Sequence, residues 1–83
     1  MSKVHQILLV DDDDTLRETL AEQLGLYEEF ATVNAATATA GVQALKSQRF
    51  DLAVFDVGLP DMDGREAVKI ARKNGFKGPI IML

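Results

Sequence analysis

Two acidic segments of this 83-residue chain carry side chains that could do chemistry. Four consecutive aspartates, Asp11 to Asp14, follow the apolar run Gln6 to Val10, and Asp56 ends the run Leu52 to Asp56. A short apolar run bounded by polar residues predicts a strand that is buried on both faces. Open α/β sheets bind ligands outside the carboxyl ends of their strands. Both acidic segments are therefore predicted to lie where a ligand would bind.

These carboxylates predict a cation site. If the two strands are neighbours, Asp11 or Asp12 emerges beside Asp56 at one sheet edge. Like charges about 4 Å apart repel by on the order of 4 kcal/mol at an effective dielectric near 20, so the cluster needs a proton or a cation. A few oxygen ligands with room for water and a phosphate oxygen suit Mg²⁺ better than Ca²⁺. An EF-hand calcium loop is excluded, because Leu16 stands where that loop requires glycine.

Each acidic segment also has a purely structural interpretation. In it, Asp56 caps the turn after its strand by accepting hydrogen bonds from backbone N–H groups. The aspartate run begins a helix, whose N-terminus favours carboxylates as caps and as charges near the helix dipole. That explains Asp13 or Asp14, but not two aspartates directly after a buried strand.

Three amphipathic or short helices are predicted between the strands. Leucines recur every fourth residue of the first helix, and Gly25 stands near its end. The second helix is expected over 37–48 and the third over 65–74. The apolar residues expected on the buried helix faces are Leu16, Leu20, Leu24, Val42, Ala44, Leu45, Ala67, Val68, Ile70 and Ala71.

The order of the elements predicts an α/β fold. A weak strand at 31–36 and an apolar strand beginning at Ile80 complete the alternation of strands and helices, which implies a parallel sheet with right-handed crossovers. The chain ends at Leu83 on a bare apolar strand, an edge that natural proteins usually protect. We therefore expect a fold that is truncated partway, and self-association as a homodimer through this edge.

Composition and charge narrow the function classes. The chain is one small domain, with 47% hydrophobic and 27% charged residues, as in soluble globular domains. Residues 1–41 hold eight acids and two bases, a net charge of −6, and residues 42–83 hold five acids and seven bases, a net charge of +2. This distribution argues against nucleic-acid binding by this segment. Without cysteine, a membrane-length apolar run or a signal-peptide core, the protein is expected to be cytoplasmic, with no membrane partner.

Two segments together resemble the receiver domain of two-component response regulators. Val10-Asp11-Asp12 follows the first strand, and Asp56 with Leu59-Pro60-Asp61-Met62-Asp63-Gly64 follows the third, in the order and at the spacing of that family. The resemblance covers all 83 residues and implies a flavodoxin-like, doubly wound parallel sheet with strand order 2-1-3-4-5. By this comparison, residues 1–83 form the N-terminal part of a receiver domain and lack its fourth helix, fifth strand and fifth helix.

The resemblance implies a phosphorylation-dependent signalling switch rather than an enzyme. A histidine kinase or a phosphotransfer protein would donate a phosphoryl group to the phosphoacceptor, Asp56. Mg²⁺ would be the cofactor, with Asp12 as a direct ligand, Asp11 acting mainly through water, and Asp56 and the Gly58 backbone carbonyl completing the protein ligands. An output domain, most commonly DNA-binding in this family, would lie outside the chain.

The chain departs from the receiver family at two positions, and two alternative functions remain beside the receiver interpretation. The family uses a Ser or Thr after the fourth strand and a Lys after the fifth, and neither is present, so switching by this chain is expected to be impaired. One alternative is a receiver-like module that dimerises without phosphorylation. The other is a haloacid-dehalogenase-type phosphatase, because LLVDDDDTL fits its Asp-x-Asp-x-Thr motif with Asp11 as nucleophile, Asp13 as general acid and Thr15 in place.

Overall fold

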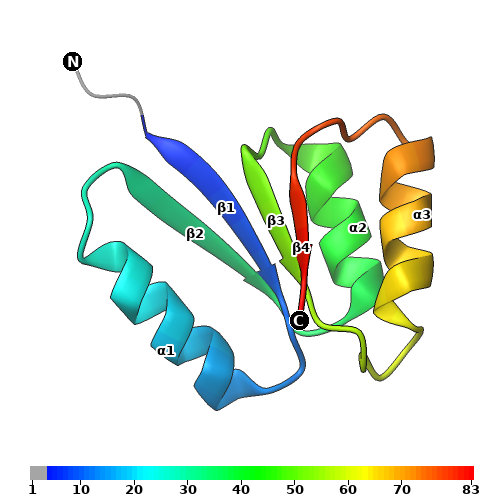
Figure 1. The fold of residues 1–83 in the computed structure, drawn as a ribbon, viewed down its shortest axis with the longest axis horizontal. Helices are drawn as coiled ribbons and strands as arrows, with labels where there is room; N and C mark the ends of the chain where they lie inside the picture. Colours follow the sequence, from blue (N-terminus) through cyan, green and yellow to red (C-terminus); the bar gives the residue numbers. More distant parts are fainter. Residues whose placement is uncertain (1–3) are drawn as a thin grey trace.

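The computed structural model describes residues 4–83. Lys3, one of the two bases counted in residues 1–41, therefore lies outside the described part, as do the first residues of the chain, in which no signal-peptide core was found. Within residues 4–83, strands and helices alternate along the chain (Figure 1). The elements are β1 (His5–Val10), α1 (Asp14–Gly25), β2 (Phe30–Ala35), α2 (Ala38–Ser47), β3 (Leu52–Phe55), α3 (Gly64–Lys73) and β4 (Ile80–Met82). The predicted elements are all confirmed, with boundaries within one or two residues.

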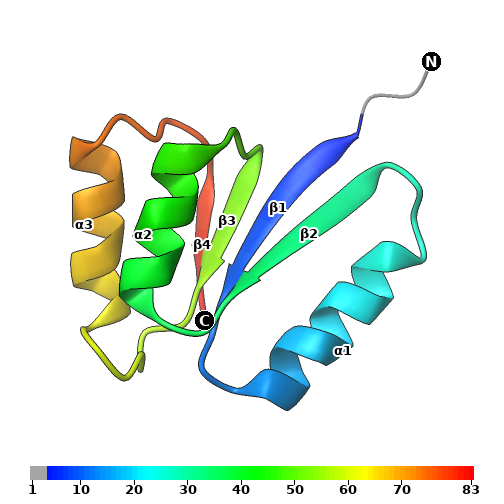
Figure 2. The same cartoon turned by 180° about the vertical axis from the view of Figure 1, so that it is seen from behind.

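The four strands form one parallel sheet in the order β2-β1-β3-β4. This order confirms the α/β class and agrees with the first four strands of the order that the family resemblance implied. β1 and β3 are the two central strands, so the acidic segments that follow them leave the sheet at adjacent positions. Figures 1 and 2 show α2 and α3 side by side, with α1 set apart from them.

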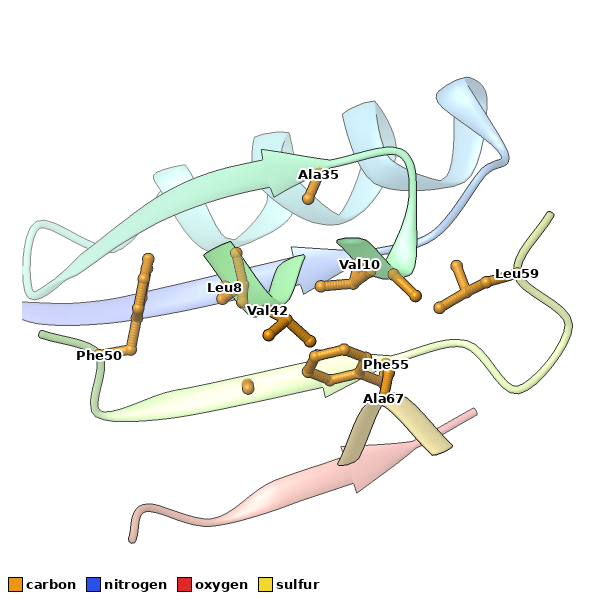
Figure 3. Close-up of a cluster of buried hydrophobic side chains, with 10 residues drawn as sticks. Leu8, Val10, Ala35, Val42, Phe50, Phe55, Leu59 and Ala67 are labelled. Carbon is orange, nitrogen blue, oxygen red and sulfur yellow. The ribbon is translucent and has the colours of Figure 1, made fainter. Parts of the chain in front are cut away.

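The main core lies between the sheet and the helices α2 and α3 (Figure 3). Leu8 and Phe55 are completely buried there, and burying one such side chain stabilises a fold by roughly 1.5–3 kcal/mol. Gly41 allows α2 to approach β1 closely, because a Cβ at that position would lie only 2.6 Å from Val10 Cγ2. The helix-breaking tendency of this glycine is therefore offset by close helix–sheet packing.

The opposite face of the sheet is covered less completely. Alternate residues of a strand point to opposite faces, so Ile7 and Leu9 of β1 lie on the face away from α2. They line an apolar groove of about 320 Å³ together with residues of α1, β3 and the β4 segment. The remaining lining residues are Leu20, Gln23, Leu24, Leu52, Val54, Ile81 and Leu83.

Two residues expected on buried helix faces are instead more than one third exposed. Ile70 is 38% exposed, because the small residues Gly64, Ala67 and Ala71 turn toward the core and Ile70 lies roughly a quarter turn from the middle of that stripe. Leu16 is also 38% exposed, in the first turn of α1. The predicted direction of each apolar stripe is right, but its extent is wrong at these two positions.

Candidate functional site

The carboxyl ends of β1 and β3 bring the two acidic segments together at the lower edge of the sheet in Figure 1. Val10 pairs with Phe55 in the parallel ladder. Asp56, the residue directly after β3, donates its N–H to the Val10 carbonyl at 2.9 Å. The Asp11 N–H donates to the Ala35 carbonyl of β2 at 3.1 Å. Asp11 and Asp56 therefore leave neighbouring strands side by side, as predicted.

Asp11, Asp12 and Asp56 form a cluster of three carboxylates. Each offers one oxygen, and these oxygens lie within 4.8 Å of one another. Asp11 is only 5% exposed, whereas Asp56 is half-buried and Asp12 is exposed. Three negative groups at this separation repel one another unless a proton or cation joins them. Hard oxygen donors in so small a number fit Mg²⁺, which keeps several waters and binds through few carboxylates.

The loop between β1 and α1 is held by hydrogen bonds between near neighbours. The Oδ1 atom of Asp11 accepts the N–H of Asp13 at 2.8 Å, and Oδ1 of Asp13 accepts the N–H of Leu16 at 3.0 Å. Asp13 is therefore the N-cap of α1, and Asp14 is the first residue of the helix. The structural interpretation is correct for these two residues, while Asp11 and Asp12 belong to the carboxylate cluster.

Arg17 supports the same loop from inside α1. Its guanidinium donates to the backbone carbonyl of Asp11 and to the carboxylate of Asp14, and its side chain is only 13% exposed. In the described part of the chain, its Nε is buried without a hydrogen-bond partner. From the sequence, Arg17 was counted only as one of the two bases of residues 1–41. Its spacing of three residues from Asp14 was a usable signal, but its contact with Asp11 depends on the path of the loop.

The loop between β3 and α3 folds back on itself beside Asp56. The Gly64 N–H donates to the Val57 carbonyl at 2.8 Å, and Leu59 is buried against the main core. A Cβ on Gly64 would lie 2.1 Å from the backbone oxygen of Asp56. Glycine is therefore required for α3 to begin this close to Asp56.

Gly58 and Asp63 meet across this loop in an isolated antiparallel bridge. A Cβ on Gly58 would lie 4.0 Å from Oδ2 of Asp56, so the Gly58 backbone runs beside that carboxylate. Asp63 caps α3 by accepting the Arg65 N–H at 2.8 Å. The Arg65 guanidinium and N–H lower the pKa of Asp63 from 3.8 to about 2. The role of the Gly58 carbonyl as a metal ligand stays a prediction.

Asp61 connects the same loop to α2. Its Oδ1 accepts the N–H of Ala38 at 2.8 Å, and its Oδ2 accepts the N–H of Thr39 at 2.9 Å and the Thr39 hydroxyl at 2.6 Å. The Thr39 hydroxyl, followed by the two N–H groups, lowers the pKa of Asp61 from 3.8 to about 2. This contact was not predicted from the sequence, because its partners lie 22 and 23 residues away and no local pattern marks them.

Comparisons with known proteins agree with this geometry. The family described as "Response regulator receiver domain" matches residues 7–83. The transcriptional regulatory protein PmrA of Pectobacterium parmentieri is 35% identical over 78 residues, which cover 94% of this chain and 35% of PmrA. A protein-glutamate methylesterase/protein-glutamine glutaminase of a Nocardioides species is also 35% identical over 78 residues, covering 93% of this chain and 21% of that protein. The chain thus spans about a third or less of these curated relatives.

Solved structures show the same fold. A CheY-like response regulator receiver domain protein from Methanospirillum hungatei matches with a TM-score of 0.87 and 35% identity, covering 96% of this chain and 63% of its own. The response regulator protein TrrA from Thermotoga maritima, solved in complex with Mg²⁺ and BeF, matches with a TM-score of 0.87 and 29% identity, covering 95% of this chain and 68% of its own. The chain spans about two thirds of each of these structures.

Proposed function

Because this chain belongs to the response regulator receiver domain family, it is a signalling switch rather than an enzyme, and we propose that Asp56 is its phosphoacceptor. The observation that carries this proposal is the cluster of Asp11, Asp12 and Asp56 at the ends of two central strands. Asp11 is buried and its Oδ1 accepts a backbone N–H. Asp56 is half-buried and reachable by a donor group.

The proposed reaction is phosphoryl transfer from a phosphohistidine on a histidine kinase or a phosphotransfer protein. A carboxylate oxygen of Asp56 attacks the phosphorus, the P–N bond to the donor histidine breaks as the new P–O bond forms, and the freed imidazole takes a proton from water. The product is an acyl phosphate on Asp56. Such transfer depends mainly on positioning and on neutralising charge, since the protein itself supplies little other covalent chemistry.

We propose Mg²⁺ as the cofactor, held by Asp11, Asp12, Asp56 and the Gly58 carbonyl. When bound, the ion would neutralise charge on the carboxylate and phosphoryl oxygens. The oxygen-only donor set supports this proposal, as does the similarity to TrrA, which was solved in complex with Mg²⁺ and BeF. The Asp13 N–H and the Arg17 guanidinium fix Asp11 in place, so this ligand is oriented before any ion arrives.

For the longer protein to which this chain would belong, we propose a cognate histidine kinase and an output domain. Similarity to PmrA, a transcriptional regulatory protein, supports a DNA-binding output region outside this chain. We also propose that these 83 residues switch poorly by themselves, since Leu83 follows β4 and the hydroxyl and lysine that the family uses are not among them. A form extended through a fifth strand and its lysine should respond to phosphorylation more strongly than the 83-residue chain.

The expected cytoplasmic location stays a prediction. None of the helices described in residues 4–83 has the length and apolar character that a membrane span requires. The haloacid-dehalogenase alternative is less favoured, because the receiver domain family matches residues 7–83 and one oxygen of its proposed general acid, Asp13, caps α1 by accepting the Leu16 N–H.

Dimerisation through the β4 edge is the second candidate function. It is supported by the exposure of Ile81, which is 47% exposed, and of Leu83, which is 54% exposed. In sedimentation velocity, the 83-residue chain should shift from monomer to dimer as its concentration rises. Ile81→Lys should abolish this shift, because lysine on an edge strand opposes strand pairing. A wild-type chain that stays monomeric at high concentration would refute the dimer.

The phosphoacceptor proposal is tested by incubating the chain with acetyl phosphate and Mg²⁺ and mapping the modified residue by mass spectrometry after borohydride reduction. We expect modification at Asp56 and none in Asp56→Asn. Modification at Asp11 would instead favour the phosphatase alternative. If neither this chain nor its extended form is modified, the dimerisation module becomes the better account.

A further inference from the structure

We propose that Asp61 is a positioning residue for the carboxylate cluster, and that it fixes the loop carrying Asp56 and Gly58 by holding it to the N-terminus of α2. The inference rests on the proposed function, because it concerns how Asp56 and the other proposed Mg²⁺ ligands are held in position relative to one another. Asp61 is not one of the three carboxylates that meet in the cluster.

Asp61 is attached firmly to α2. Both carboxylate oxygens are used, and all three donors belong to Ala38 and Thr39 in the first turn of α2. Charge-assisted hydrogen bonds of this kind are shorter and stronger than neutral ones. The loop is thus attached to a helix that lies 22 or more residues away in the sequence.

The helix α2 is itself fixed against the sheet. This helix packs directly on β1, where Gly41 meets the side chain of Val10. Val10 is the residue immediately before Asp11. Asp61 therefore ties the loop after β3 to the same strand that delivers the other two carboxylates.

Contacts within the loop after β3 connect Asp61 to Asp56. The loop is closed by the hydrogen bond from the Gly64 N–H to the Val57 carbonyl and by the bridge between Gly58 and Asp63. Since these contacts make the loop one compact unit, holding it at Asp61 restrains Gly58 and Asp56 as well. Losing this attachment would leave the loop fixed to the core chiefly through Leu59 and Met62.

A purely structural role for Asp61, as a cap that only stabilises α2, can be separated from this one. The same helix has a second cap, because the Thr37 hydroxyl accepts the Ala40 N–H at 3.1 Å. Thr37→Ala therefore weakens the N-terminus of α2 without releasing the loop after β3. Asp61→Ala does both, so the pair of variants isolates the positioning role.

The test measures Mg²⁺ affinity by calorimetry, and amide hydrogen exchange at Gly64 in the metal-free protein relative to the most protected amides of β1. We expect Asp61→Ala to weaken Mg²⁺ binding at least fivefold and to speed the Gly64 exchange at least tenfold. Thr37→Ala should leave both within about twofold of wild type. Asp61→Asn should fall between, since its amide oxygen retains one acceptor, and it carries the comparison if Asp61→Ala does not fold.

Affinity and loop exchange that are equal in the Asp61 and Thr37 variants would overturn the positioning role while leaving the proposed function intact. If the wild-type chain neither binds Mg²⁺ nor is modified at Asp56, the proposed function fails. In that case the metal-free exchange at Gly64 still decides whether Asp61 holds the loop, because this readout needs neither the ion nor the reaction.

Discussion

The loop after β1 and the loop after β3 supply the same cluster of carboxylates but are held in different ways. The first uses near neighbours, in which Asp11 binds the N–H of Asp13 and Arg17 reaches back six residues to the Asp11 carbonyl. The second uses Asp61, whose partners lie 22 and 23 residues away on α2. The side-chain contacts that hold the loop after β1 thus stay within residues 11–17, whereas the loop after β3 has an additional side-chain contact with a distant helix.

Gly64→Ala should have the largest effect, because it strikes the loop after β3 at its backbone. The new Cβ would lie 2.1 Å from the Asp56 oxygen and 3.0 Å from Val57 Cα, so α3 or the loop must move. We expect the free energy of unfolding in urea to fall by about 3 kcal/mol, out of roughly 4–12 kcal/mol for a chain of this length. Gly25→Ala, with nothing within 4 Å of its Cβ, should change it by less than about 1 kcal/mol. Equal losses would contradict the close approach.

Arg17→Ala tests the loop after β1 in the same way. It removes charge-assisted hydrogen bonds to Asp11 and Asp14 from a side chain that is only 13% exposed. We expect a loss of about 2 kcal/mol in urea unfolding. Lys69→Ala breaks an exposed pair with Glu66 at 3.4 Å and serves as the control, with an expected loss below about 0.5 kcal/mol. A loss as small for Arg17 as for Lys69 would mean that this loop holds itself without the arginine.

Mg²⁺ should couple the two loops thermodynamically. At ten times its dissociation constant, the ion should stabilise the fold by about 1.4 kcal/mol if it binds only the native state. Asp12→Ala should abolish this gain, and without Mg²⁺ the variant should be more stable than wild type, because one of three like charges is gone. Glu22→Ala, which removes an exposed acid elsewhere on α1, should retain the full gain. Thermal denaturation with and without Mg²⁺ measures both effects, and a gain that survives in Asp12→Ala would place the ion elsewhere.

Acid should act selectively on the loop after β3. The pKa of Asp61 is lowered from 3.8 to about 2, first by the Thr39 hydroxyl and then by backbone N–H groups. The unfolded chain therefore binds a proton at higher pH than the native chain, so stability is lost as the pH falls from about 4 toward 2. In Asp61→Asn the thermal midpoint should fall less steeply over this range. An identical slope in the two proteins would show that Asp61 makes no native contact in solution. Asp63, whose pKa is also lowered, contributes equally to the pH dependence of both proteins.

The same contrast explains what could be predicted from the sequence. Two apolar runs ending in aspartates predict strands whose carboxyl ends carry Asp11, Asp12 and Asp56. Their meeting depended also on the two strands being neighbours, and that order came from the family resemblance. The hold of Asp61 on α2 could not be predicted, because it depends on how the loop after β3 lies against a distant helix. The exposure of Ile70 was missed for a related reason, since the rotation of α3 depends on its small residues packing against the core.

The most direct test of one shared site is a Mg²⁺ titration followed by the amide resonances of the ¹⁵N-labelled chain. If the two loops form one site, the amides of residues 11–13 and of residues 56–58 should shift together, saturate, and fit a single dissociation constant. The same shifts should be absent in Asp12→Ala. Shifts confined to one loop, or shifts that spread over surface acids without saturating, would contradict the account.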